Sequence, residues 1–357
     1  MHRKVHVHES DLARATRSNN HAGSTYKSLL NISSSVIPQV ILPSLCLTVW
    51  AALVTVFVTV PGINFLNKFE PYERDAKKVV LLPTSPILIS ILSIVIGLLL
   101  VFRTNTAYDR FWSGRGTWGD IKTYARNLGR LIWINSSGDS KRELTEKKAA
   151  INLIYAFATS LKHMLRSEDF LDYEDLAPYL AHLPEYHPEK LQNASISDSP
   201  VPLELTFHIS TFINKLASAK QIDGPTQTQM VVLVNNLIAC LTNLERIRNS
   251  PIPLAYSIHL KQALLLYLVS LPFQIVISSG WYTIPVMLLA TFTLLGIEAV
   301  GGQIENPFGY DPADLPLDLF CDEIKMELAF IIEKENSHLP KNWLDPLLHV
   351  SGVAVEL

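Results

Sequence analysis

The chain has 357 residues, of which 48% are hydrophobic and 18% are charged. This composition is too apolar for an ordinary soluble enzyme and too charged for a chain made only of membrane spans. The formal net charge of -3 argues against a nucleic-acid partner, and three well-separated cysteines predict neither a disulfide framework nor a zinc site. We therefore expect several membrane spans joined to a polar body.

Four apolar segments predict transmembrane helices, because a helix needs about 20 apolar residues to cross a bilayer. They cover residues 36–60, 86–102, 254–277 and 282–300. The third carries His259, Lys261 and Gln262 near its start, and these polar groups must lie near an interface or face protein or water. One such segment alone is also compatible with a buried helix of a soluble protein, but four together favour a membrane protein.

Charge patterning predicts the orientation of the spans. Basic residues outnumber acidic ones in the tail before the first span and again in residues 103–130, after the second span. Because cytoplasmic flanks are enriched in Lys and Arg, both flanks are predicted to be cytoplasmic. Four spans then return the C-terminus to the cytoplasm. We expect the plasma membrane, with an organelle membrane as the alternative.

Between the second and third spans lie about 150 residues, far more than an ordinary loop holds. Residues 149–165 and 226–247 have a helical pattern of apolar residues, and strand alternation is rare throughout. The sequence therefore predicts an all-α polytopic membrane protein with four transmembrane helices and a cytoplasmic helical body. The predicted segments are a cytoplasmic N-terminal tail (1–30), the first two transmembrane helices (31–102), a cytoplasmic helical region (103–250), the third and fourth transmembrane helices (251–301) and a cytoplasmic C-terminal segment (302–357).

The stretch FRTNTAYDRFWSGRGTWGD, residues 102–120, follows the second apolar segment without a Pro or an obvious turn. We predict that one helix continues from the membrane into the cytoplasm. On such a helix Arg103 and Arg110, seven residues apart, share a face. The alternative to a functional role for these arginines is interfacial anchoring with salt bridges to Asp109 and Asp120.

Three blocks of sequence resemble the bacterial and fungal branch of the bestrophin family of anion channels. They are FRTNTAYDRFWSGRGTWG (102–119), NSPIPLAYSIHL (249–260) and IENPFGYDPADLPLD (304–318), in the order and spacing of that family. The resemblance covers residues 23–335. It implies a homopentamer in a lipid bilayer that conducts chloride and other monovalent anions through a central pore, with the second span lining a narrow neck.

The resemblance places the neck at Ile94, Leu98 and Phe102. Independently of the family, their i, i+4, i+8 spacing puts these three side chains on one helix face. A face of this kind can also pack against a neighbouring helix, and that alternative stays open. An apolar neck gates by dewetting. Arg103 and Arg110, just below it, are expected to attract anions to the mouth of the pore, most strongly at low salt.

The block after the fourth span has two interpretations. In animal bestrophins the matching region binds calcium, and the corresponding residues here are Gln303, Asn306, Asp311 and Asp314. Calcium takes six to eight oxygen ligands, but Pro312 and Ala313 interrupt the acidic run of the animal proteins. In the alternative interpretation, Asp314 or Asp318 caps a helix that begins near Leu317. No cofactor is therefore expected to be required, and calcium binding stays open.

Other classes of function are weighed against a channel. The sequence has no Gly-rich phosphate loop, no H-E-x-x-H and no nucleophile elbow, so we do not expect an enzyme. A proton-coupled transporter would use Glu298, near the inner end of the fourth span, with His259 as its partner. A membrane-anchored helical scaffold without conduction is the third class.

Overall fold

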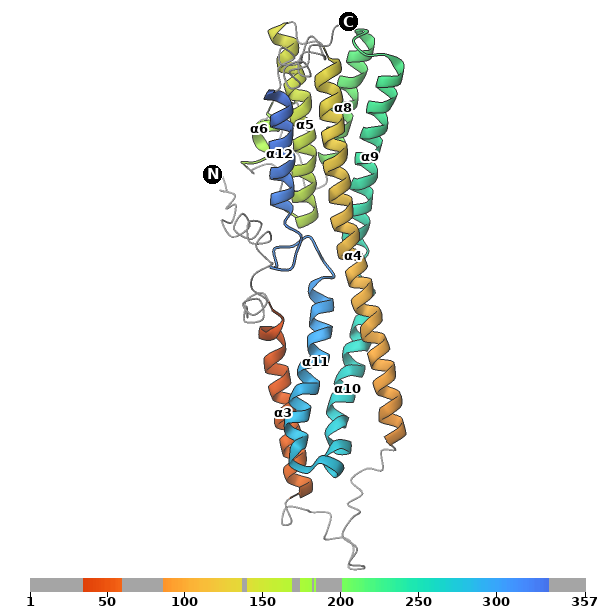
Figure 1. Cartoon of the computed structure of the whole chain (residues 1–357), viewed down its shortest axis with the longest axis vertical. Coiled ribbons are helices and arrows are strands. Elements are labelled where there is room, and N and C mark those ends of the chain that lie inside the picture. Colours follow the sequence, from red (N-terminus) through yellow and green to blue (C-terminus); the bar gives the residue numbers. More distant parts are fainter. Residues whose placement is uncertain are drawn as a thin grey trace, which may run out of the picture. The chain divides into compact units, whose positions relative to one another are not determined.

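The computed structural model describes residues 35–59, 86–136, 140–168, 174–181, 183 and 201–333, and this described part is helical with no strand. The elements are α3 (Ile37–Thr59), α4 (Pro86–Asn135), α5 (Lys141–Arg166), α6 (Ala177–Leu180), α8 (Val201–Ser218), α9 (Gly224–Asn249), α10 (Leu254–Ser279), the 3₁₀ turn η5 (Gly280–Tyr282), α11 (Thr283–Gln303) and α12 (Leu317–Glu333) (Figure 1). The all-α prediction is confirmed for these residues. The predicted N-terminal tail, residues 1–30, lies outside them.

The chain divides into two compact units, which we call the span unit and the body unit. The span unit holds α3, α4 through Arg115, α10, η5, α11 and the segment that ends at Leu315. The body unit holds the rest of α4, then α5, α6, α8, α9 through Arg246, and α12. The five segments predicted from the sequence, with boundaries at residues 102, 250 and 301, stay a prediction.

Helix α4 is one uninterrupted helix of 50 residues that contains both the second apolar segment and the arginine-rich stretch after it. The predicted continuous helix is thus confirmed. No proline follows Pro86 within it to break the backbone ladder. At 1.5 Å per residue a helix of this length extends about 75 Å, whereas the hydrocarbon core of a bilayer is about 30 Å thick. More than half of α4 must therefore lie outside the hydrocarbon.

By length and hydropathy, four described helical stretches qualify as membrane spans: Ile37–Thr59, Ile89–Asn135, Gly224–Asn249 and Leu254–Gln303. The last stretch contains both the third and the fourth predicted spans, α10 and α11. The stretch in α9 was predicted as part of the body. Its buried side chains recur every three or four residues, at Met230, Val234, Leu237, Leu241 and Leu244. Its exposed side carries Asn235 and Asn243, whose side-chain amides are costly to place in lipid. We therefore keep α9 as a surface helix of the body.

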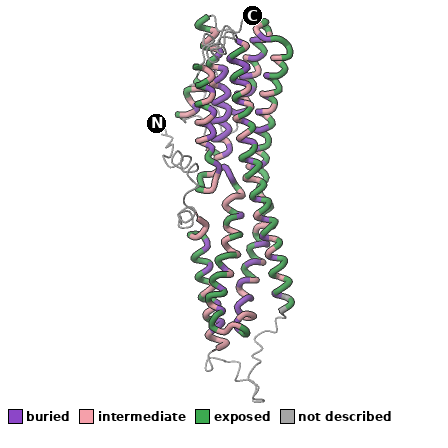
Figure 2. Tube along the Cα trace, viewed as in Figure 1, coloured by how far each residue is buried: buried purple, intermediate pink, exposed green. Residues whose placement is uncertain are grey.

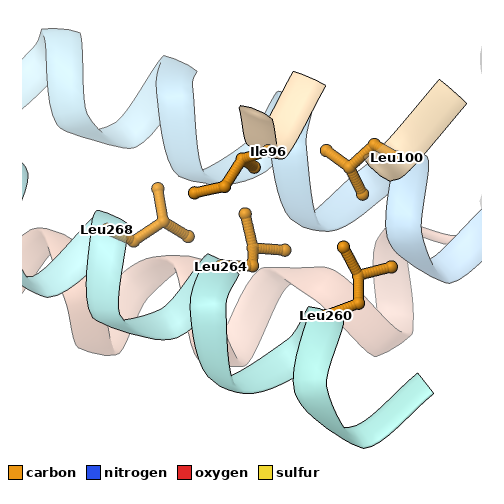
Figure 3. Packing of buried hydrophobic residues seen from close by; sticks show 5 residues of the cluster. All are labelled: Ile96, Leu100, Leu260, Leu264 and Leu268. Carbon is orange, nitrogen blue, oxygen red and sulfur yellow. The ribbon is translucent and has the colours of Figure 1, made fainter. Parts of the chain in front are cut away.

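Leucines and an isoleucine join α4 to α10 in the core of the span unit. Ile96 and Leu100 of α4 point toward Leu260, Leu264 and Leu268 of α10 (Figure 3). Each set recurs every four residues, which places its members on one helix face. This packing fixes the rotation of α4 within the span unit, so the residues on its opposite face cannot contact α10.

Helix α5 forms the centre of the body unit and is buried along most of its length (Figure 2). It begins with a capping box, in which the Ser140 hydroxyl accepts from the Glu143 N–H and the Glu143 carboxylate accepts from the Ser140 N–H. Helices α8 and α12 pack against it. The sequence prediction of a helix over residues 149–165 is confirmed, and the helix extends well before that range.

Buried charges tie α5 to its neighbours within the body unit. Lys162 Nζ lies 2.6 Å from a carboxylate oxygen of Asp175 and 2.9 Å from one of Asp318. His163 Nε2 lies 3.0 Å from the Asp175 carboxylate, and Arg166 donates to Asp318 at 2.9 Å. Burial by itself would raise the pKa of the Asp175 carboxyl, but hydrogen bonds from His163 and Lys162 lower this pKa to about 2.

Replacing Asp175 with Asn is expected to lower the free energy of unfolding at pH 7 by about 2 kcal/mol. The pKa of Asp175 is lower in the folded state than its ordinary value of 3.8. Its contribution is therefore present above about pH 4 and is lost as the pH falls toward about 2. Denaturant unfolding at neutral and acid pH measures both effects. Glu174→Gln, at the exposed neighbouring position, is the control. Equal stability of D175N and the wild type at pH 7 would contradict this account.

Candidate functional site

The three residues predicted to form the neck lie together on an open face of α4. In the single chain the side chains of Ile94, Leu98 and Phe102 are 72%, 54% and 57% exposed. Ile96 and Leu100, which point toward α10, are 2% exposed. The shared face inferred from the spacing is therefore present and is left uncovered within the chain. Whether this face lines a pore stays a prediction.

Arg103 is buried inside the span unit, with only 4% of its side chain exposed. Its Nη1 donates to the Ser257 hydroxyl of α10 at 2.8 Å. Its Nη2 lies 3.7 Å from Glu298 of α11 and 3.5 Å from Glu305. A Cβ at Gly301 would lie 3.6 Å from Arg103 Nε, an ordinary contact distance, so the guanidinium packs directly against this part of α11. The acidic partners of Arg103 are therefore Glu298 and Glu305, rather than the Asp109 and Asp120 considered from the sequence.

Arg110 binds backbone carbonyls. Its Nε donates to the carbonyl oxygen of Glu305 at 3.0 Å, and its two other nitrogens donate to the carbonyls of Ile247 and Ser250. Ile247 lies in the last turn of α9, where carbonyl groups lack partners within the helix and the helix dipole favours a positive charge. Arg110 thus holds the end of α9 and the segment after α11 against α4.

These contacts favour a structural role for both arginines. Attraction of anions by Arg103 and Arg110 stays a prediction. However, the charge of Arg103 is compensated by two carboxylates, and the donors of Arg110 are directed at carbonyl oxygens. Glu305 takes part in both sets of contacts and also accepts from the Ile252 N–H at 3.3 Å. No local pattern in the sequence assigns a role to Glu305.

The segment after α11 is closed by the carboxylate of Asp314. Asp314 Oδ2 accepts from the Asp311 N–H at 2.7 Å, and the Asp314 N–H donates back to the Asp311 carbonyl at 2.9 Å. A Cβ at Gly309 would lie 2.7 Å from the same Oδ2, so a larger residue would force the carboxylate to shift from this position. The Leu315 N–H donates to the Pro307 carbonyl at 3.0 Å. Asp314 therefore stabilises a compact turn.

The four residues considered for calcium are arranged only partly as a site. Gln303 and Asp311 line one cavity of about 340 Å³ in the span unit, together with Glu298 and Lys261. A lysine ammonium in this cavity opposes a divalent cation, and one carboxylate oxygen of Asp314 is already used by the turn. The described residues include no group of three or more His, Cys, Asp or Glu side chains arranged for a metal. The carboxylate of Asp318, the alternative helix cap, binds Lys162 and Arg166 instead. The residues present fit calcium poorly.

Comparison with known proteins identifies relatives of this chain. A family model described as Bacterial/Fungal Bestrophin protein matches residues 16–329. A voltage-dependent anion channel-forming protein of Nostoc sp. is 48% identical over 247 residues, which are 69% of this chain and 77% of that protein. A protein of the same description from Synechocystis sp. is 42% identical over 241 residues, 68% of this chain and 76% of that protein. The crystal structure of a bacterial bestrophin homolog from Klebsiella pneumoniae has a TM-score of 0.66 at 23% identity and covers 83% of this chain and 100% of that one.

Proposed function

The chain belongs to the bacterial and fungal bestrophin family, and we propose that it conducts chloride and other monovalent anions through the central pore of a homopentamer. It is an integral membrane protein and an anion channel, as its relatives from Nostoc and Synechocystis are named. We assign its four spans to α3, the first part of α4, α10 and α11. In the proposed assembly, α4 of each subunit lines the pore.

The single observation that carries the pore is the open apolar face of α4. Ile94, Leu98 and Phe102 are more than half exposed within the subunit, although the residues between them pack tightly on α10. A ring of subunits would bring copies of this face around one axis. The resulting constriction would be lined by apolar side chains, which gate by dewetting and pass weakly hydrated anions most easily.

The contacts of Glu298 weigh against a proton-coupled transporter. Its carboxylate lies 3.7 Å from Arg103 and 3.6 Å from Lys261, so two cations compensate its charge. His259, its partner in the transporter hypothesis, is exposed on α10. Pairing of Glu298 with two basic residues is what a structural carboxylate near the membrane interface requires. We therefore assign Glu298 to the packing of the span unit and not to proton transfer.

The proposed orientation follows from charge. The cytoplasm is the expected side for the arginine-rich part of α4, because basic flanks are retained there. An even number of spans would then place both termini in the cytoplasm, in segments that lie outside the described residues. The plasma membrane is the proposed location.

Purified protein in liposomes separates the three functional classes. We expect a chloride gradient to drive anion flux that is independent of a proton gradient, together with unitary currents after fusion of the vesicles with a bilayer. A transporter would give proton-coupled flux without unitary currents, and a scaffold would give neither. Empty liposomes and liposomes with heat-denatured protein are the controls.

We propose that the channel needs no calcium for its fold, because the carboxylate of Asp314 is occupied by the turn. Melting curves of the wild type with calcium and with chelator, at matched ionic strength, should superimpose. Asp314→Asn keeps an acceptor oxygen and should cost less stability than Asp314→Ala, which removes the acceptor and costs about 1 kcal/mol. A rise in melting temperature with calcium that disappears in an Asp311→Asn, Asp314→Asn double variant would contradict this proposal and support calcium binding at these two residues.

A further inference from the structure

We propose that Asp109 faces the conduction path below the neck and lowers the preference of the channel for anions over cations. This inference rests on the proposed function, because it needs α4 to line a pore. It concerns the selectivity of that pore and not its existence. Asp109 would thus be a specificity-determining residue of the channel.

The position of Asp109 follows from the periodicity of α4. Leu98, Phe102, Asn105 and Asp109 are spaced by four, three and four residues, which is the repeat of a single stripe along a helix. All four side chains are exposed in the subunit. The stripe that begins with the apolar neck therefore continues into an amide and then a carboxylate. If Leu98 and Phe102 line the pore, Asp109 lies on the same side about two turns further along.

The basic residues near Asp109 are directed elsewhere. Arg103 is buried against Glu298 and Glu305, and Arg110 donates to the carbonyls of Ile247, Ser250 and Glu305. Arg115 is exposed, but it follows Asp109 by six residues and so lies about 120° away around the helix. Among the described residues Asp109 forms no salt bridge that would compensate its charge. The uncompensated charge on this stripe is therefore negative.

A ring of such carboxylates changes which ions enter the neck. Each subunit of the proposed homopentamer would contribute one Asp109, and rings of acidic side chains concentrate cations and repel anions. The apolar neck itself carries no charge of either sign. For five charges about 10 Å from the axis, screened Coulomb energies lower the local anion concentration and raise the local cation concentration each about threefold at about 0.15 M salt and each about tenfold at about 0.01 M. The local anion-to-cation ratio therefore changes about sevenfold at about 0.15 M salt and about a hundredfold at about 0.01 M.

Reversal potentials under a potassium chloride gradient test the proposal. Asp109→Asn should raise the anion-to-cation permeability ratio about sevenfold at about 0.15 M salt, and more at lower salt. Asn105→Asp adds the same charge one turn nearer the neck and should lower the ratio. Asp109→Glu keeps the charge and should leave the ratio unchanged. Glu333→Gln removes an exposed carboxylate from α12, in the body unit, and is the matched control with no expected effect.

An unchanged ratio for D109N at both salt concentrations would overturn the proposal while leaving the anion channel intact. Absence of anion current in the wild type would instead overturn the proposed function. If D109N does not assemble, N105D decides, because an unchanged ratio in that variant would show that the stripe does not face the conduction path. An equal rise in the ratio for D109N and for Glu333→Gln would also overturn the proposal, since the effect would then belong to overall charge.

Discussion

Replacing Arg103 with Gln is expected to destabilise the subunit by about 3 kcal/mol, the cost of removing one partner from a buried ion pair. The variant would leave the carboxylates of Glu298 and Glu305 without the cation that joins α4 to α11. It would also remove the donor to Ser257. The free energy of unfolding in detergent, measured with denaturant, gives the loss directly, and size-exclusion chromatography gives the fraction that still assembles.

Arg130 supplies the matched control, because it is an exposed arginine on the same helix. Its replacement with Gln should change the free energy of unfolding by less than about 0.5 kcal/mol. The sequence predicts instead that Arg103 attracts anions to the mouth of the pore, and Arg103→Gln distinguishes that role from the structural one. If Arg103 attracts anions, the variant would be as stable as the wild type, and its conductance would fall at low salt but not at high salt, as it should when a charge at the pore mouth is removed.

Truncating two leucines of α4, Leu98 and Leu100, is expected to have opposite consequences. Leu98→Ala should change the unitary current or the open probability and leave assembly intact, because a side chain that is 54% exposed has few partners within the subunit. Leu100→Ala should cost about 2–5 kcal/mol of stability, because it opens a cavity against α10. Phe102→Ala should behave like Leu98→Ala. Bilayer recording and thermal unfolding of the same preparations separate the two effects.

Loss of assembly in both Leu98→Ala and Phe102→Ala, with unchanged currents from any protein that still assembles, would contradict the assignment of these residues to the neck. The open face of α4 would then be a packing face between subunits. Leu100→Ala controls for a general effect of truncation, because both leucines lie on the same helix and lose the same side-chain atoms on replacement with Ala.

Much of the fold follows from local patterns in the sequence. The apolar segment at residues 86–102 and the absence of a later proline predict that α4 continues without a turn, and the structure contains that continuous helix. The i, i+4, i+8 spacing of Ile94, Leu98 and Phe102 predicts one shared face, which is also present. Both features depend on neighbours within a few turns of one helix, and sequence periodicity reports such neighbours directly.

The contacts of the arginines depend on residues far away in the chain. Arg103 meets Ser257 and Glu305 across 154 and 202 residues of sequence, and no local pattern identifies such partners. The adjacent glycines Gly301 and Gly302 are a signal in the sequence itself, because two glycines in a helix permit another element to approach closely. Read together with Glu298 and Glu305 on either side, they indicate a place where a large cation packs against α11.

Asp109 illustrates the same limit. In the sequence it was considered as a salt-bridge partner for the arginines, because opposite charges that lie close together along a helix commonly pair. Since Arg103 and Arg110 are engaged by Glu305 and by backbone carbonyls, Asp109 is left exposed on the stripe of Leu98. The charge of this part of α4 could therefore be assigned only after the long-range partners were known.

Planar-bilayer recording of the purified wild type under a potassium chloride gradient tests the central claim most directly. The account predicts unitary current steps whose reversal potential lies between zero and the chloride equilibrium potential and moves further from zero as the gradient is increased. Replacing potassium with a large organic cation should leave the steps in place. Steps that reverse near the potassium equilibrium potential and vanish with the organic cation would contradict an anion channel, and absence of steps from assembled protein would contradict a channel of any kind.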